Sequence, residues 1–208
     1  MTQYKDYGYE SAKPAHTAVY LLPPIRDLLG SIGPGTRILD VGCGNGYICG
    51  QLLENGRTVV GIDLSEQGIS IARQTYPKGR FEVLAADRDV LANLHEQPFD
   101  IVLSTEVVEH LYDPKSYIAG CHAALKPGGR MIVSTPYHGY LKNLALSVFN
   151  KWDWHLKPLW DGGHIKFWSR ETLGQLMTEA GLTNIQFRGA GRYPYMWMSM
   201  VMSGERGK

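Results

Sequence analysis

Two carboxylates and an imidazole stand within one short segment, Glu106-Val107-Val108-Glu109-His110. In a helical turn, spacings of three and four residues would put these side chains on one face. Another imidazole, that of His164, comes later, just before a stretch that reads as a helix. Carboxylate oxygens and imidazole nitrogens form a ligand set that suits Mn, Fe, Co or Zn better than Mg, and it accepts Mg when that ion keeps bound waters. The candidate metal ligands are therefore Glu106, Glu109, His110 and His164.

A role without a metal is the first alternative for these residues. His110 or His164 would then be the catalytic residue and act as a general base, since a neutral imidazole takes up a proton near neutral pH. A solvated helix face without chemistry is the second alternative. The apolar run 99–104 directly precedes the segment, and ligands of α/β proteins bind where such strands end. The position therefore favours a functional role.

A glycine-rich turn is the second chemical feature of the chain. Residues 38–46 read Ile-Leu-Asp-Val-Gly-Cys-Gly-Asn-Gly, a branched apolar run that ends in an acid and three alternate glycines. Glycines let the backbone approach a ligand closely, because they lack a Cβ. A second apolar run, 58–62, ends at Asp63, and an acid there can accept both hydroxyls of a ribose. The pattern predicts the first strand-helix-strand unit of a nucleotide-binding sheet.

The glycine spacing limits the kind of nucleotide. A dinucleotide-binding turn needs its third glycine at position 47, where this chain has Tyr47. The turn also lacks the Lys-Ser or Lys-Thr pair of a phosphate-binding P-loop. We therefore expect a ligand with a ribose but no pyrophosphate, and a nicotinamide-dependent reductase is disfavoured.

The elements that position these residues alternate as in α/β proteins. Strands are predicted near 37–41, 58–62, 81–84, 99–104 and 130–134, followed by an antiparallel pair near 184–189 and 195–202. Helices are predicted at 14–29 with a kink at Pro23-Pro24, at 46–54, 65–75 and 114–125, and after an N-capping Ser169. The carboxyl ends of the parallel strands would bring the acids and glycines to one edge of the sheet.

Residues 36–136 resemble the class I S-adenosylmethionine (SAM) methyltransferases. The run 38–46 is similar to their motif I, 99–104 to their fourth strand, and 125–134 to their turn into the fifth strand. The resemblance implies an α/β fold with a Rossmann-like seven-stranded sheet, mostly parallel with an antiparallel last strand, helices on both faces, an N-terminal helix and an inserted helical lid.

The resemblance also implies that SAM is the cofactor. The residues expected to contact it are His16, Asp40, Gly42, Gly44, Gly46, Asp63, Leu64, Asp87, Arg88 and Thr105. In this interpretation Asp63 accepts the ribose hydroxyls, and Asp87 resembles the acid that receives the adenine amino group. His16 and Tyr7 would cover the cofactor site, since the first ten residues are expected to form an arm or a lid.

The segment 106–110 resembles one shared by two methyltransferase families. The ubiquinone-biosynthesis O-methyltransferases act on catechol-type rings, and the small-RNA 3′-end 2′-O-methyltransferases act on a terminal ribose. The second family completes a divalent-metal site with a later His-Lys-Phe-x-Trp stretch, which 164–168 (His-Ile-Lys-Phe-Trp) resembles with one residue inserted. Both kinds of acceptor have neighbouring hydroxyls. A metal that binds such a pair lowers the pKa of one hydroxyl, so that its oxygen can attack the methyl group of SAM.

These resemblances predict an O-methyltransferase that acts on a small molecule with neighbouring hydroxyls, a catechol or a vicinal diol. An RNA or nucleoside 2′-O-methyltransferase and a metal-free small-molecule methyltransferase with a histidine base are the alternatives, and a non-catalytic SAM-binding module is disfavoured. The net charge of +1 argues against nucleic acid as a partner. Residues 137–208 carry nine basic and five acidic side chains, which favours an anionic or polar ligand near that part.

The length of 208 residues fits one domain that spans 1–208. Cys43, Cys49 and Cys121 lack metal-type spacing, which favours reduced thiols and a cytoplasmic location. No apolar run is long enough for a membrane span. The oligomeric state is left open.

Residues 137–168 break the alternating pattern and hold eight aromatic side chains. Their apolar residues from 141 to 152 fall at helical spacing. Three interpretations remain for this insert: a helix packed on the core, a lid over the acceptor substrate, and a helix on a membrane surface. The third allows at most a peripheral contact, because the polar face is not strongly basic.

Overall fold

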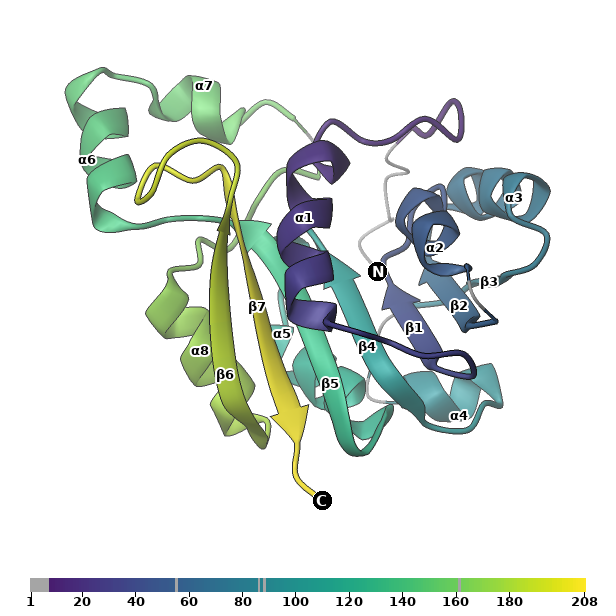
Figure 1. The fold of residues 1–208 in the computed structure, drawn as a ribbon. Helices are drawn as coiled ribbons and strands as arrows, with labels where there is room; N and C mark the ends of the chain where they lie inside the picture. Colours follow the sequence, from purple (N-terminus) through teal and green to yellow (C-terminus); the bar gives the residue numbers. More distant parts are fainter. Residues whose placement is uncertain (1–7, 55, 86, 88, 161) are drawn as a thin grey trace.

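The computed structural model describes residues 8–208 apart from 55, 86, 88 and 161. At its centre is a seven-stranded sheet with the order β3-β2-β1-β4-β5-β7-β6. The strands are β1 (Arg37–Val41), β2 (Thr58–Asp63), β3 (Arg80–Val83), β4 (Phe99–Thr105), β5 (Leu125–Pro136), β6 (Leu182–Ala190) and β7 (Ser199–Arg206). Strands β1 to β5 run parallel, whereas β7 is antiparallel to both β5 and β6. The predicted sheet is therefore confirmed (Figure 1).

Helices cover both faces of the sheet (Figure 1). They are α1 (Ala18–Leu29), α2 (Tyr47–Leu52), α3 (Glu66–Thr75), α4 (Val90–Leu94), the 3-10 helix η1 (Val108–His110), α5 (Pro114–Ala123), α6 (Tyr140–Val148), α7 (Trp152–Leu156) and α8 (Arg170–Glu179). One core cluster joins α1, α2 and α3 to the sheet, and another joins α4, α5 and α8 to it. In β1, Ile38 belongs to the first cluster and Leu39 to the second. Both faces are buried, which explains why the strands are continuous apolar runs.

Helix α1 and strand β7 differ in their bounds from the predictions. Helix α1 begins at Ala18 and continues through Pro23 and Pro24, although each proline removes a helical N–H donor. The buried side chains of Leu21 and Ile25 hold this helix on the sheet, so tertiary packing outweighs the local preference. Strand β7 begins only at Ser199, because the chain before it turns through left-handed residues, among them Arg192 and Tyr195.

The parallel strands end along one edge of the sheet. Strand β1 leads into the glycine turn there, β2 ends at Asp63, β4 ends at Thr105 and β5 ends at Pro136. Figure 1 shows α6 and α7 leaving the body beyond the same end of β5. The predicted residues Gly42, Gly44, Gly46, Asp63, Thr105 and Glu106 therefore lie along the carboxyl edge, where ligands of such sheets bind. Within the described residues, none of the helices is long and apolar enough to cross a membrane.

A capping box fixes the start of α8, directly after the segment that carries His164. Ser169 Oγ accepts a hydrogen bond from Thr172 N at 3.2 Å, and Thr172 Oγ1 accepts one from Ser169 N at 3.0 Å. We expect Ser169→Ala to lower the free energy of unfolding by about 0.5–2 kcal/mol, as the loss of an N-cap does. Urea denaturation measures this, with Ser70→Ala on the exposed face of α3 as the control within about 0.5 kcal/mol of the parent. Equal stability of both variants would contradict the assignment.

Candidate active site

The glycine turn after β1 needs its glycines for conformational reasons. Gly42, Gly44 and Gly46 have φ angles of 81°, 54° and 77°, a region that side chains with a Cβ rarely adopt. A Cβ on Gly46 would lie 2.7 Å from the Cβ of Ala72 on α3, and one on Gly42 would collide with Val107. The turn therefore brings bare backbone to the carboxyl edge, as the motif predicted.

Asp63 ties this turn to the start of α3. Gly44 N donates to its Oδ2 and Ser65 N donates to its Oδ1, each at 2.8 Å. Ser65 in turn caps α3, because its Oγ accepts from Gly68 N at 2.9 Å. The carboxylate is thus fixed in orientation at the end of β2, where the sequence placed the acid that receives a ribose.

The segment before α1 lies across the glycine turn. Asn45 Nδ2 donates to the carbonyl oxygens of Ser11 and Lys13 at 2.8 Å each, and the ring of Tyr9 contacts both Gly44 and Gly68. The sequence suggested a covering arm, but neither Tyr9 nor Asn45 was singled out. Asn45 stands inside the motif, and nothing in its spacing revealed which backbone its amide would hold.

The remaining predicted cofactor residues lie in different surroundings. Asp40 is fully buried, accepts a hydrogen bond from Cys49 Sγ at 3.2 Å, and has its pKa raised to about 7 by burial. Leu64 directly follows β2, and Thr105 is the last residue of β4, so both lie at the carboxyl edge. Asp87 and His16 are exposed. Arg88 and Tyr7 lie outside the described residues. Asp40 therefore supports the turn from within.

Glu109, His110 and His164 come together at the same edge. Each offers one oxygen or nitrogen atom, and these three atoms lie within 4.8 Å of one another. His110 Nε2 lies 3.9 Å from Glu109 Oε1, and the rings of the two histidines are 5.0 Å apart between centroids. Three of the four predicted metal ligands thus form one cluster, which we call the Glu-His-His cluster.

Backbone hydrogen bonds bring His164 to this cluster. Ile165 N and Lys166 N both donate to the carbonyl oxygen of Glu109, at 2.9 and 3.0 Å. Trp168 Nε1 donates to the carbonyl oxygen of Val108 at 3.4 Å. The segment 163–168 therefore wraps around η1, and the position of His164 follows from main-chain pairing between distant parts of the chain.

The ring of His110 is held in one orientation by its own hydrogen bond. Its Nδ1 lies 3.3 Å from the carbonyl oxygen of Gly163. A carbonyl only accepts, so Nδ1 carries the proton and Nε2 presents its lone pair on the side of Glu109. Burial lowers the pKa of His110, which keeps the ring neutral at neutral pH.

Glu109 is a buried acid with an unpaired oxygen. Its side chain is 1% exposed. Oε2 accepts from Thr135 Oγ1 at 3.0 Å, whereas Oε1 has no hydrogen-bond partner among the described residues. Burial, and then the nearby charge of Glu106, raises the pKa of Glu109 well above its usual value. An unpaired buried carboxylate oxygen is costly, so this oxygen is suited to a cation or a donor.

Glu106 lies apart from the Glu-His-His cluster, which corrects the predicted helical face. Only Val108–His110 is helical, and Glu106 itself has a left-handed φ of 55°. Its Oε1 accepts from Ser134 Oγ at 2.8 Å and its Oε2 from Ser199 Oγ at 3.1 Å. Burial raises its pKa to about 7. The spacing argument fails here because the chain turns sharply after β4 instead of entering a helix.

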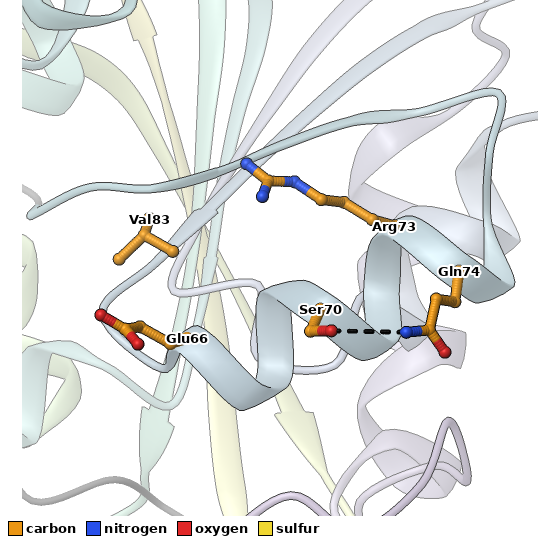
Figure 2. Close-up of a pocket in the computed structure, with 5 residues that line it drawn as sticks. All are labelled: Glu66, Ser70, Arg73, Gln74 and Val83. Carbon is orange, nitrogen blue, oxygen red and sulfur yellow. Dashed lines mark hydrogen bonds between the residues drawn. The ribbon is translucent and has the colours of Figure 1, made fainter.

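Two surface hollows lie elsewhere on the molecule. One of about 430 Å³ is lined by α3 and the edge strand β3, and Figure 2 shows Glu66, Ser70, Arg73, Gln74 and Val83 around it. The other, of about 390 Å³, lies between α8 and β6. None of the predicted site residues lines either hollow. At the Glu-His-His cluster the segment 163–168 packs against η1, Glu109 is buried, and His110 and His164 are partly exposed.

The sheet order, the glycine turn and the acid after β2 define a SAM-dependent methyltransferase of class I, as the resemblance implied. Comparison with known proteins confirms this class, since residues 15–187 match the family described as "Methyltransferase domain". The chain belongs to this family.

Curated relatives and a solved structure are similar to the chain. A ubiquinone biosynthesis O-methyltransferase from Dinoroseobacter shibae is 37% identical over 159 residues, 74% of this chain and 63% of that protein. The protein of that name from Thiobacillus denitrificans is 34% identical, over 74% of this chain and 68% of its own length. The chain thus spans about two thirds of these relatives. Magnesium protoporphyrin IX methyltransferase from Synechocystis, solved with bound SAH, has a TM-score of 0.65 at 18% identity, with 89% of this chain and 80% of that one covered; it supports the fold.

We expect Asp63→Ala to weaken SAM binding by about 2–4 kcal/mol, because hydrogen bonds to a charged group contribute about 1.5–3 kcal/mol each and water compensates in part. Isothermal titration calorimetry measures the affinity. Asp27→Ala is the matched control. It removes an exposed acid of α1 that pairs with Arg188 of β6, and this variant should bind SAM like the parent. Unchanged affinity in Asp63→Ala would remove Asp63 from the cofactor site.

Proposed function

We propose that the protein transfers the methyl group of SAM to one oxygen of a small molecule with neighbouring hydroxyls, such as a catechol or a vicinal diol. The observation that carries the proposal is the buried, unpaired Oε1 of Glu109 beside the Nε2 lone pair of His110 and the ring of His164. These groups accept protons or cations, which is the chemistry that an unreactive hydroxyl requires. The names of the curated relatives support oxygen as the methyl acceptor.

The same donor set fits a divalent metal. Glu109, His110 and His164 would hold it, and Glu106 would join as the fourth ligand if its carboxylate turned away from Ser134 and Ser199. Glu109 is buried and also feels the negative charge of the partly buried Glu106, and such an uncompensated carboxylate favours binding of a cation. When bound, such an ion would polarise the acceptor hydroxyls and lower their pKa. Bonds of about 2.0–2.2 Å would require the three ligand atoms to draw closer than the 4.8 Å now seen.

The histidines can also move the proton themselves. Burial lowers the pKa of His164 to about 4 and lowers that of His110, so both rings are neutral at neutral pH and can accept a proton. The acceptor hydroxyl would give its proton to a ring nitrogen while its oxygen forms a bond to the methyl carbon. The electron pair of the broken carbon–sulfur bond stays on sulfur and leaves S-adenosylhomocysteine (SAH). A metal-free enzyme with a histidine base is therefore the alternative mechanism.

The insert 137–168 is proposed to cover the acceptor. Helix α6 buries only Lys142, and its apolar Leu141, Leu144 and Val148 are exposed, so it does not pack its apolar face on the core. Helix α7 brings Trp152 and His155 next to His138. Electrostatic coupling connects His138 and His155 with His164. His138 and His155 therefore lie within electrostatic reach of the Glu-His-His cluster, with Trp152 beside them, while Tyr140, Phe149 and Trp154 are exposed. This arrangement suits a lid better than core packing.

Chelation tests the metal. We expect treatment with a chelator, and separately His164→Ala, to lower methyl transfer to catechol by on the order of 100-fold or more while SAM affinity stays within about threefold. A radiolabelled-methyl assay and elemental analysis measure both. His122→Ala on α5 is the matched control, since His122 lies outside the cluster. Full turnover of metal-free protein would reject the metal and leave the histidine base.

The two tryptophans of α7 test the lid. Trp152 is partly buried, with its ring parallel to that of His138 at 6.5 Å between centroids, whereas Trp154 is 65% exposed. We expect Trp152→Ala to raise the acceptor KM about tenfold, since one aromatic contact is worth about 0.5–1.5 kcal/mol beyond its buried area. Trp154→Ala should leave KM within about twofold. Steady-state kinetics at saturating SAM measure the acceptor KM of both variants. Equal changes of KM in the two variants would contradict a lid in this orientation.

A further inference from the structure

Helix α6 presents a lysine to the interior and its apolar side chains to solvent. Lys142 is 3% exposed, whereas Leu141, Leu144 and Val148 are 48%, 46% and 68% exposed. Burial of an ammonium group is expensive unless charges or hydrogen bonds satisfy it. The orientation of α6 therefore points to a partner for Lys142 that outweighs the apolar contacts given up by the helix.

The protein itself supplies few partners for the ammonium group of Lys142. Lys142 Nζ donates to the carbonyl oxygen of Met198 at 3.1 Å, which uses one of its three N–H bonds. Among the described residues no carboxylate lies within 4.0 Å of it. The charges that act on Lys142 are those of Arg192, which repels it, and Glu106, which attracts it. Both oxygens of Glu106 already accept hydrogen bonds from Ser134 and Ser199.

Two further unpaired nitrogens lie in the same part of the insert. Neither His138 Nε2 nor His155 Nε2 has a hydrogen-bond partner within the described part of the chain. Their rings are 5.3 Å apart between centroids. Both histidines interact electrostatically with Lys142 and with His164 of the Glu-His-His cluster. His138 is also flanked by the rings of Trp152 and Phe167.

We propose that Lys142, assisted by His138 and His155, binds a carboxylate of the acceptor substrate. This proposal rests on the proposed function and narrows it to hydroxylated acids, a ring with neighbouring hydroxyls and a carboxyl group. Of the charges that act here, those of Lys142 and Arg192 are positive and that of Glu106 is negative, which suits a singly charged carboxylate better than a doubly charged phosphate. The carboxylate would satisfy the unused N–H bonds of Lys142 and hold the hydroxyls toward the Glu-His-His cluster.

The charge states support this assignment. Burial lowers the pKa of Lys142 to about 8, and burial lowers the pKa of His138 and of His155 to about 4. At neutral pH most Lys142 side chains are therefore protonated, whereas both imidazoles are neutral. A neutral imidazole carries a single N–H, so each ring donates to the carboxylate in the tautomer that protonates its Nε2. The aromatic side chains Trp152 and Phe167 beside His138 are suited to a planar ring.

A pair of probes that differ only in the acid tests the proposal: 3,4-dihydroxybenzoate and catechol. We expect the parent protein to methylate the acid with a kcat/KM about tenfold or more above that of catechol, as charge-assisted hydrogen bonds allow. Lys142→Met should remove this preference through KM, so that the ratio of the two kcat/KM values falls toward one. Lys151→Met, an exposed lysine before α7, should behave like the parent. Equal turnover of both probes by the parent, or an equal loss for both in Lys142→Met, would overturn the proposal.

Binding separates this proposal from the proposed function. Benzoate has the carboxylate but no hydroxyls, so its affinity for the SAH-loaded protein does not depend on methyl transfer. Calorimetry should show binding to the parent and about tenfold weaker binding to Lys142→Met. If neither diol is methylated but benzoate binds in this way, the anion site stands and the O-methylation fails. No benzoate binding to the parent overturns the anion site, whatever the folding of the variant.

Discussion

The carbonyl oxygen of Glu109 accepts two backbone hydrogen bonds, from Ile165 and Lys166, and the site depends on this pairing. It fixes the segment 163–168 against the short helix after β4, so that His164 faces His110. The same segment supplies the Gly163 carbonyl that sets the tautomer of His110. Ligand position, ring orientation and proton placement therefore all follow from one main-chain contact between segments far apart in the sequence.

Charge balance is the second constraint at the carboxyl edge. Glu109 is buried and Glu106 is partly buried, and burial raises the pKa of each. Hydroxyl groups of Ser134, Ser199 and Thr135 satisfy three of their four oxygens, but hydroxyls carry no charge. Lys142 is the nearby cation that acts on Glu106. The site is thus ordered but electrostatically incomplete, which is the state expected of a protein that completes its site with ligands.

Local signals predicted the glycine turn and the acid at the end of β2, whereas tertiary contacts determine where Glu106, His164 and Lys142 lie. The glycines of 42–46 and the acid at 63 are readable from sequence, because positive φ angles and strand ends restrict residue type directly. The position of Glu106 was not readable, since its spacing to Glu109 fits a helix that the chain does not form. The inward Lys142 was not readable either, because helical apolar spacing predicts the opposite face. Its role depends on the loop before β7, which only the folded chain brings near.

The loop before β7 connects the surroundings of Lys142 with those of Glu106. The carbonyl oxygen of Met198 accepts from both Tyr137 N and Lys142 Nζ, at 3.2 and 3.1 Å, and the next residue, Ser199, donates to Glu106. A shift of α6 would therefore move Met198, which accepts from Lys142, and with it the adjacent Ser199, which donates to Glu106. Because β7 lies antiparallel between β5 and β6, its first residues meet the carboxyl ends of the parallel strands. The antiparallel strand thus places the groups proposed for the acceptor beside those proposed for its activation.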